Sequence, residues 1–246
     1  MTYYERIGVG YAERRRPDPR IERQIHRALG DASSVVNVGA GTGSYEPTDR
    51  RVVAVEPALQ MLEQRPAGAA PVVRAVAERL PFPDGCFDAA LAVLTIHHWA
   101  DVEQGFAELR RVARRQVILG FDLHRQTDHW LVRDYVPAWA ELEESGTATV
   151  ERTLALLENP RTETVPVPAD CTDGFGGAYW KRPEAYLDPD VRLSISSLAR
   201  LPADDVEPGL ARLADDLASG RWHERNADLL DRDELDLGYV LVVGGT

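Results

Sequence analysis

The sequence predicts an α/β fold, a Rossmann-like doubly wound sheet, on two observations. Short apolar runs alternate with segments of helical spacing through the first half of the chain, as in consecutive βαβ units. One of these runs, 35–38, leads directly into a turn with glycine at positions 39, 41 and 43. Such a run is typical of a strand buried on both faces, and glycines after it let the backbone approach a ligand. Ligands bind at the carboxyl edge of open α/β sheets, so this turn predicts the functional site.

The elements of the first half follow from their residue patterns. Ile21, Ile25 and Leu29 recur every four residues, which predicts a helix over 20–29 that ends at Gly30. The other predicted helices of this half are 58–64 and 101–112, and its predicted strands are 35–38, 51–57, 72–76, 87–94 and 117–122. Strands and helices in this alternation predict a mainly parallel sheet.

The pattern changes after Asp122. Residues 124–146 have helical spacing but many aromatic and histidine residues, and 170–187 is an irregular stretch rich in acidic, glycine and aromatic residues. Further predicted elements are a short edge strand at 163–167, a helix from 199 and a closing strand at 239–243. The predicted organisation is therefore a cofactor-binding core at 1–123, an inserted substrate cap or lid at 124–200, and a return to the core sheet at 201–246.

The composition limits the classes of partner. A net charge of −12 over 246 residues disfavours binding to nucleic acid or to an anionic membrane surface. The two cysteines, Cys86 and Cys171, have neither disulfide nor metal-ligand spacing, so no metal site is expected. The N-terminus lacks the apolar stretch of a signal peptide, and no run reaches the length of a membrane span. We expect a cytoplasmic protein, a monomer or homodimer, with a small-molecule partner.

The glycine turn admits three kinds of ligand. A phosphate-binding P-loop requires a lysine after the glycines, and the residues that follow Gly43 are Ser, Tyr and Glu. A dinucleotide site requires its third glycine three residues after the second, whereas these glycines are evenly spaced. The remaining class is a nucleoside ligand without phosphate. Its ribose would be held by Glu56, which follows the second strand about 20 residues after the glycines, the spacing at which such an acid reaches ribose hydroxyls.

Five segments occur in an order that resembles one family. They are Val-Val-Asn-Val-Gly-Ala-Gly-Thr-Gly (35–43), Val-Glu-Pro (55–57), Ala-Glu-Arg-Leu-Pro-Phe-Pro-Asp (77–84), Phe-Asp-Ala-Ala-Leu-Ala (87–92) and His-His-Trp (97–99). Together they resemble the class I S-adenosylmethionine-dependent methyltransferases, in particular the branch that methylates small molecules. The resemblance implies S-adenosylmethionine as cofactor and a seven-stranded sheet whose last strand is antiparallel.

The resemblance also implies cofactor contacts, position by position. These are Gly39, Gly41 and Gly43 around the methionine part, Glu56 on the ribose hydroxyls, Pro57 and Met61 as walls of the adenine, Ala77 and Glu78 beside the adenine, and Leu94 and Thr95 near the sulfonium. In this branch an aromatic and basic N-terminal segment folds over the cofactor, where Tyr11 and Arg16 are the candidates, Arg16 for the methionine carboxylate. The family most often has Asp at the position of Asn37. The amide oxygen of Asn37 can still accept a hydrogen bond from the ammonium group, but without the charge.

The acceptor side is expected beyond the fourth strand. His97 and His98 follow that strand where the acceptor would approach, and a neutral imidazole can serve as a base when the acceptor atom carries a proton. Asp122 and His124, after the fifth strand, are candidates for the wall of the acceptor pocket. The loop around Cys171 is a candidate lid, and Cys171 itself is expected to be an inert buried thiol.

The leading hypothesis is an enzyme that transfers a methyl group to O, N or C of a small, heterocyclic or aromatic metabolite by in-line displacement. A non-catalytic cofactor- or partner-binding protein on the same fold is the alternative, because Asn37 departs from the family pattern. A methyltransferase of tRNA or protein is a third candidate. The acidic net charge and the absence of a basic stripe disfavour tRNA.

Overall fold

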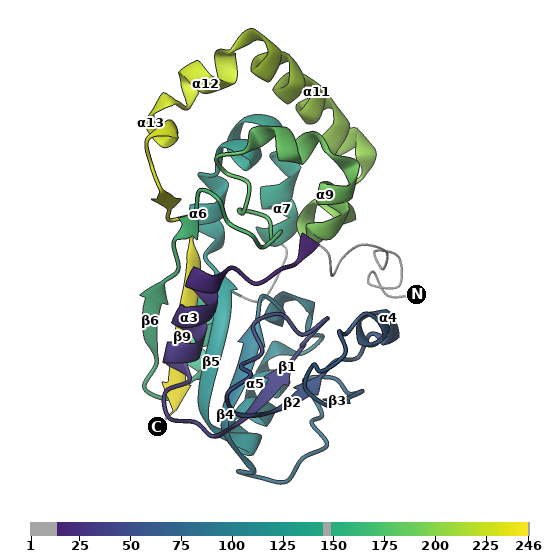
Figure 1. The fold of residues 1–246 in the computed structure, drawn as a ribbon, viewed down its shortest axis with the longest axis vertical. Coiled ribbons are helices and arrows are strands. Elements are labelled where there is room, and N and C mark those ends of the chain that lie inside the picture. Colours follow the sequence, from purple (N-terminus) through teal and green to yellow (C-terminus); the bar gives the residue numbers. More distant parts are fainter. Residues whose placement is uncertain (1–13, 145–148, 246) are drawn as a thin grey trace.

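The computed structural model describes residues 14–144 and 149–245, so Tyr11 lies outside the described residues. Its main feature is a seven-stranded sheet with the strand order β3-β2-β1-β4-β5-β9-β6 (Figure 1). The strands are β1 (Ser34–Val38), β2 (Arg51–Val55), β3 (Val72–Val73), β4 (Phe87–Val93), β5 (Ala113–Phe121), β6 (Arg161–Thr164) and β9 (Tyr239–Gly245). Strands β1 to β5 pair in parallel, and β9 runs antiparallel to β5 and β6. The predicted Rossmann-like sheet with an antiparallel last strand is confirmed.

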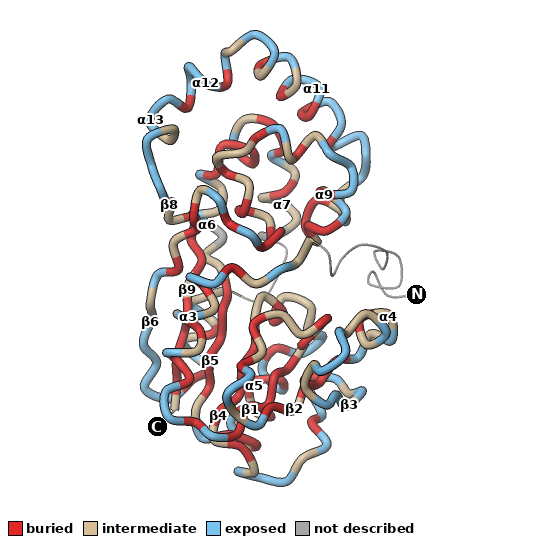
Figure 2. Tube along the Cα trace, viewed as in Figure 1, coloured by how far each residue is buried: buried red, intermediate tan, exposed pale blue. Residues whose placement is uncertain are grey.

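The central strand β1 is buried along its whole length because both faces of the sheet are covered (Figure 2). Val35 belongs to the core on one face and Val36 to the core on the other, since successive side chains of a strand alternate. The first core includes helix α3 (Pro19–Ala28), which crosses β5 and β9 in Figure 1, and the second includes helix α5 (Val102–Val112). Asp101 caps α5 as a helix N-cap does, because its side chain accepts from the N–H of Gln104.

A helical cap stands over the carboxyl ends of the parallel strands (Figure 1). Its elements are α6 (Leu123–Thr127), the π-helix η2 (Leu131–Tyr135), α7 (Ala138–Glu144), the 3-10 helix η3 (Pro183–Leu187), α9 (Pro189–Ser194), α10 (Ser196–Arg200), α11 (Ala203–Ser219), α12 (Arg221–Arg225) and α13 (Ala227–Leu230). The cap has an apolar core of its own, in which Trp130 contacts Tyr186 and Trp222 edge-to-face.

The structure divides the chain differently from the predicted ranges at two points. Strand β6 lies inside the predicted cap range 124–200, but it pairs with β9 in the main sheet. Helices α11 to α13 lie inside the predicted return to the sheet, but α11 packs on η2 in the cap. The physical reason is that Leu210 and Leu213 of α11 bury against the aromatic residues of the cap. The chain therefore enters the cap twice, once before β6 and once after it, and returns to the sheet for the last time at β9.

The remaining elements differ little from their predicted ranges. Strand β3 has only two residues because the chain from Arg74 onward turns to line a cleft. Strand β6 ends before Pro166, whose ring nitrogen has no hydrogen to donate to a neighbouring strand. The other elements are α4 (Leu59–Glu63), the 3-10 turn η1 (Ile96–His98), α8 (Val150–Leu156) and a two-stranded ribbon of β7 (Val167–Pro168) and β8 (Glu234–Leu235). No helix among residues 14–144 and 149–245 is long and apolar enough to cross a membrane.

Candidate active site

A cleft of about 460 Å³ lies where β1, β2 and β4 end. Most of the predicted site residues line it: Asn37, Gly39, Gly41, Glu56, Pro57, Met61, Ala77, Glu78, Leu94, Thr95 and His98. The sheet order brings them together, because β1 lies between β2 and β4 and all three strands end at the same edge. Gly43 and Arg16 do not line the cleft, and the side chain of Arg16 is exposed.

The glycine turn has a backbone that other residues rarely adopt. Gly39 has a φ of +69°, and a Cβ on it would overlap Oγ1 of Thr95. Gly41 has a φ of +53°, and a Cβ on it would meet no atom within 4 Å, which leaves the turn open toward the cleft. The turn is fixed from behind by hydrogen bonds from the N–H groups of Gly39 and Ala40 to the carbonyl of Val55.

Glu56 is a buried carboxylate at the end of β2, with 6% of its surface exposed. It accepts hydrogen bonds from the N–H groups of Gly41 and Ala58, each at 2.8 Å. Burial raises the pKa of Glu56, and these two hydrogen bonds oppose the rise. The arrangement places one acidic group beside the glycine turn, with apolar wall residues such as Met61 and Ala77 next to it.

A second, smaller cavity of about 50 Å³, the chamber, adjoins the cleft. The two cavities share Arg15, Leu94 and His98. The chamber wall combines aromatic rings with neutral polar groups, chiefly His97, Phe121, Gln126, Trp139, Phe175 and Tyr239. Leu94 separates cleft and chamber in the left-handed conformation, with a φ of +49°, a backbone strain that is typical of functional sites.

Comparison with known proteins decides the family. A methyltransferase domain matches residues 36–121, from β1 to the end of β5. A solved structure from Anabaena variabilis, described as a "putative methyltransferase from antibiotic biosynthesis pathway", is 32% identical with a TM-score of 0.87. The match covers 94% of this chain and 99% of that one. This chain belongs to the class I S-adenosylmethionine-dependent methyltransferases.

More distant structures share the fold of this methyltransferase. A protein of Thermotoga maritima, described as a possible histamine N-methyltransferase, is 16% identical with a TM-score of 0.54, and the match covers 98% of this chain and 93% of that one. The [4+2]-cyclase SpnF is 17% identical with a TM-score of 0.52, with coverage of 92% and 80%. No curated protein sequence matches the chain. S-adenosylmethionine is the cofactor of the methyltransferase.

The cleft fits this cofactor. Glu56 offers a carboxylate to a pair of hydroxyls, the open turn at Gly41 leaves room for an amino-acid tail, and apolar residues of α4 and the 75–77 segment offer walls to a purine. Sequence reasoning missed Arg15, which lines both the cleft and the chamber, and selected Arg16 instead. Three consecutive arginines carry no signal that distinguishes the one turned inward.

The two histidines after β4 are neutral in the folded methyltransferase. Burial, the neighbouring imidazole of His98 and the cations Arg200 and Arg15 hold the pKa of His97 well below its usual value. Burial and Arg200 lower the pKa of His98 to about 4. The ring centroids of His97 and His98 lie 3.8 Å apart, and Nδ1 of His97 has no hydrogen-bond partner among the described residues. His98 reaches both cavities, whereas His97 lines the chamber alone.

We expect the free energy of unfolding of the methyltransferase to fall by about 2 kcal/mol or more as the pH is lowered from 6.5 to 4.5. His97, His98 and the buried His129 of the cap, whose pKa burial lowers to about 3, resist protonation when folded. The unfolded chain takes up these protons below pH 6.5, so stability is full above that pH and is lost below it. Urea denaturation across this range measures the effect.

A His129→Leu variant is the control for this pH dependence. It removes one of the three histidines from a site that is 4% exposed, and its stability should change less steeply with pH. A wild-type unfolding free energy that stays constant between pH 6.5 and 4.5 would contradict the neutral state of these rings.

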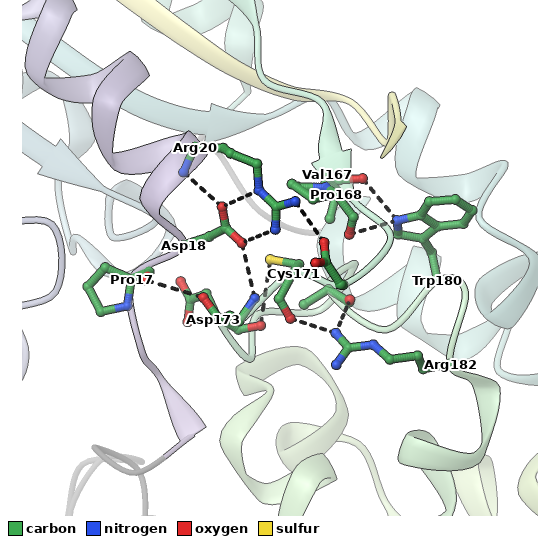
Figure 3. A network of polar contacts seen from close by, with 12 residues as sticks. Pro17, Asp18, Arg20, Val167, Pro168, Cys171, Asp173, Trp180 and Arg182 are labelled. Carbon is green, nitrogen blue, oxygen red and sulfur yellow. Dashed lines mark hydrogen bonds and ion pairs between the residues drawn. The ribbon is translucent and has the colours of Figure 1, made fainter. Parts of the chain in front are cut away.

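The other acceptor-side candidates lie outside the chamber wall. Asp122 caps α6, because its side chain accepts from the N–H of His124, and His124 is exposed. The loop from 170 to 182 is tied to the N-terminal segment rather than left open (Figure 3). Burial raises the pKa of the Cys171 thiol to about 12, so this thiol stays protonated and is not a nucleophile.

Asp173 joins three segments beneath the cleft. It forms an ion pair with Arg15 at 2.6 Å, accepts from the hydroxyl of Tyr45 at 2.8 Å and accepts from the N–H of Gly174. Its side chain is fully buried, and that of Arg15 is 13% exposed. The inward orientation of Arg15 therefore depends on a residue of the cap loop. Nearby, hydrogen bonds from Arg20 and Thr172 hold the pKa of the Asp18 carboxyl at about 2 against its burial (Figure 3).

Proposed function

We propose that this methyltransferase methylates an O, N or C atom of a small, aromatic or heterocyclic molecule that is neutral or anionic. The observation that carries the proposal is the chamber, which adjoins the cofactor cleft at Leu94 and His98. Its wall offers aromatic faces and neutral hydrogen-bonding groups, as sites for small planar ligands do.

The bound cofactor supplies an electrophilic methyl group, and the chain supplies position and a dry environment. Glu56 would hold the ribose, and Pro57, Met61, Ala77 and Glu78 would surround the adenine. Gly39, Gly41 and Asn37 would hold the methionine part, with Leu94 and Thr95 beside the sulfur. In place of the predicted Arg16, we assign the methionine carboxylate to Arg15, because Arg15 lines the cleft.

His98 is the best-placed candidate base. It lines both cavities, so its ring lies near the line along which an acceptor would approach the methyl group. Its lowered pKa keeps the ring neutral at physiological pH, so the ring can accept a hydrogen bond from an acceptor hydroxyl or ring N–H, and the same shift makes it a weaker base than a free imidazole. The ring of His97 contacts that of His98 at a tilt of 51° and would orient it.

The charge of the chamber selects against cationic acceptors. Arg15 lies in its wall, and Arg200 is close enough to lower the pKa of both histidines. Among the described residues, the chamber wall contains no aspartate or glutamate. A protonated amine would meet the positive charge of Arg200 there, and the nearby carboxylate of Asp173 is already paired with Arg15, which makes a cationic acceptor unfavourable in a partly buried site. The chamber volume of about 50 Å³ is smaller than an aromatic ring needs, so we propose that the cap moves when such an acceptor binds.

The test uses methyl-labelled S-adenosylmethionine and a metabolite extract separated at pH 7 into cationic and non-cationic fractions. We expect the wild-type protein to transfer label to the non-cationic fraction, and a His98→Asn variant to transfer it more slowly. Transfer to the cationic fraction alone would contradict the proposed acceptor class. Cofactor binding without transfer to either fraction would favour the non-catalytic alternative.

The proposal extends to partners and location. The net charge of −12 favours a small molecule over nucleic acid or a membrane surface as the partner, and we propose a monomer or homodimer. Both cysteines are free thiols, which supports a reducing, cytoplasmic environment.

A further inference from the structure

We propose that Glu46 is a positioning residue for the cofactor, because it orients the amide of Asn37 so that the amide oxygen faces the cleft. In the family this negative charge most often belongs to an aspartate at position 37. Here Glu46 carries it, and the side chain of Asn37 lies between Glu46 and the ligand. This inference rests on the cofactor and its cleft, not on the identity of the acceptor.

The contact between the two side chains sets the orientation of the amide. Asn37 is 2% exposed, and its Nδ2 donates to Oε1 of Glu46 at 3.1 Å. With the amide reversed, its oxygen would face the carboxylate of Glu46, two acceptors with no hydrogen between them. Asn37 also lines the cleft, so the oxygen that remains is available to an ammonium group there.

Arg65 holds the carboxylate of Glu46 in place. Its Nη2 donates to both carboxylate oxygens of Glu46, at 2.9 and 2.8 Å, and the two side chains are only 5% and 8% exposed. The same guanidinium donates to the carbonyls of Gly41 and Ala70. A buried carboxylate, its cation and the glycine turn therefore form one unit behind the cofactor tail.

This arrangement makes aspartate at position 37 unfavourable in this chain. In Asn37→Asp, the new carboxylate would take the place of the amide that now contacts Glu46 at 3.1 Å. A single guanidinium would then face two negatively charged carboxylates in contact with each other, which is unfavourable in a buried site. Neutralising position 46 removes the conflict. In Asn37→Asp with Glu46→Gln, the glutamine amide can donate to the aspartate, so the hydrogen bond forms in the opposite direction.

The experiment measures binding by calorimetry for wild type, Asn37→Asp, Glu46→Gln and the double variant. The probes are S-adenosylhomocysteine and 5′-methylthioadenosine, which lacks the amino-acid tail. We expect Asn37→Asp to lower the affinity for S-adenosylhomocysteine about ten-fold, which corresponds to the loss of one charge-assisted hydrogen bond. The affinity of the double variant for S-adenosylhomocysteine should lie within about three-fold of the wild-type value. Binding of 5′-methylthioadenosine should stay within about two-fold throughout, because it does not reach this unit.

Glu46→Gln alone gives an independent result if Asn37→Asp does not fold. Without an anion at position 46 the amide of Asn37 has no fixed orientation. We therefore expect the affinity for S-adenosylhomocysteine to fall about three- to ten-fold and the affinity for 5′-methylthioadenosine to stay unchanged. The proposal is overturned if Asn37→Asp binds S-adenosylhomocysteine as tightly as wild type, if the double variant is no better than Asn37→Asp, or if Glu46→Gln affects both probes equally or neither. Wild-type binding with no transfer to any acceptor would count against the proposed function and leave this inference standing.

Discussion

Replacing Glu56 by alanine is expected to weaken S-adenosylhomocysteine binding about 100-fold. Two hydrogen bonds to a carboxylate contribute about 3 kcal/mol together, and 1.4 kcal/mol corresponds to about a factor of ten. Glu56 is positioned to make them because it is held by the N–H groups of Gly41 and Ala58 at the floor of the cleft. Calorimetric titration of wild type and variant measures the difference.

A conservative variant and a modified ligand make this prediction specific. Glu56→Gln keeps the shape of the side chain and one acceptor oxygen, so we expect the affinity for S-adenosylhomocysteine to fall about ten-fold. A 2′-deoxy ligand should bind more weakly than its ribose counterpart to wild type and equally to Glu56→Ala. A folded Glu56→Ala protein that binds S-adenosylhomocysteine within about two-fold of wild type would remove Glu56 from the site.

Replacing Asp173 by alanine is expected to lower the free energy of unfolding by about 3–5 kcal/mol. The substitution would leave the partly buried guanidinium of Arg15 without its anion and the hydroxyl of Tyr45 without its acceptor. Burial and the neighbouring Asp173 carboxylate raise the pKa of Tyr45 well above its usual value, so this hydroxyl stays protonated and needs an acceptor. Urea denaturation monitored by tryptophan fluorescence measures the loss.

Asp170→Ala is the matched control in the same loop. Asp170 pairs with Arg20, but its side chain is 82% exposed, so its removal should leave the stability nearly unchanged. Asp173→Ala should also weaken the binding of S-adenosylhomocysteine, since Arg15 would lose its fixed position beside the cleft. Equal stabilities of the two variants would show that the buried pair does not hold the loop to the N-terminal segment.

The parallel core could be predicted because its signals are local. The run at β1, the glycines after it and Glu56 at the end of β2 each lie within a few residues, and parallel pairing brings their ends together. The residues of the chamber come from segments far apart in the chain, such as Phe121, Trp139 and Phe175. Nothing in the sequence indicates that these rings meet, because only tertiary packing decides it.

The same limit explains the other differences. Leu210 and Leu213 form a buried stripe on α11, but they pack against Trp130 and Trp222 of the cap rather than against the sheet. A stripe shows that a helix face is covered but not what covers it. The choice between Arg15 and Arg16 depends on Asp173, which lies 158 residues away in the chain.

A crystal structure with S-adenosylhomocysteine tests the central claim most directly, namely that the cofactor cleft and the chamber meet at Leu94 and His98. The account predicts ribose hydroxyls on Glu56, the amino-acid tail between Asn37 and Arg15, and the sulfur directed at the chamber. A sulfur directed at solvent, or a tail that lies away from Asn37 and Arg15, would contradict it.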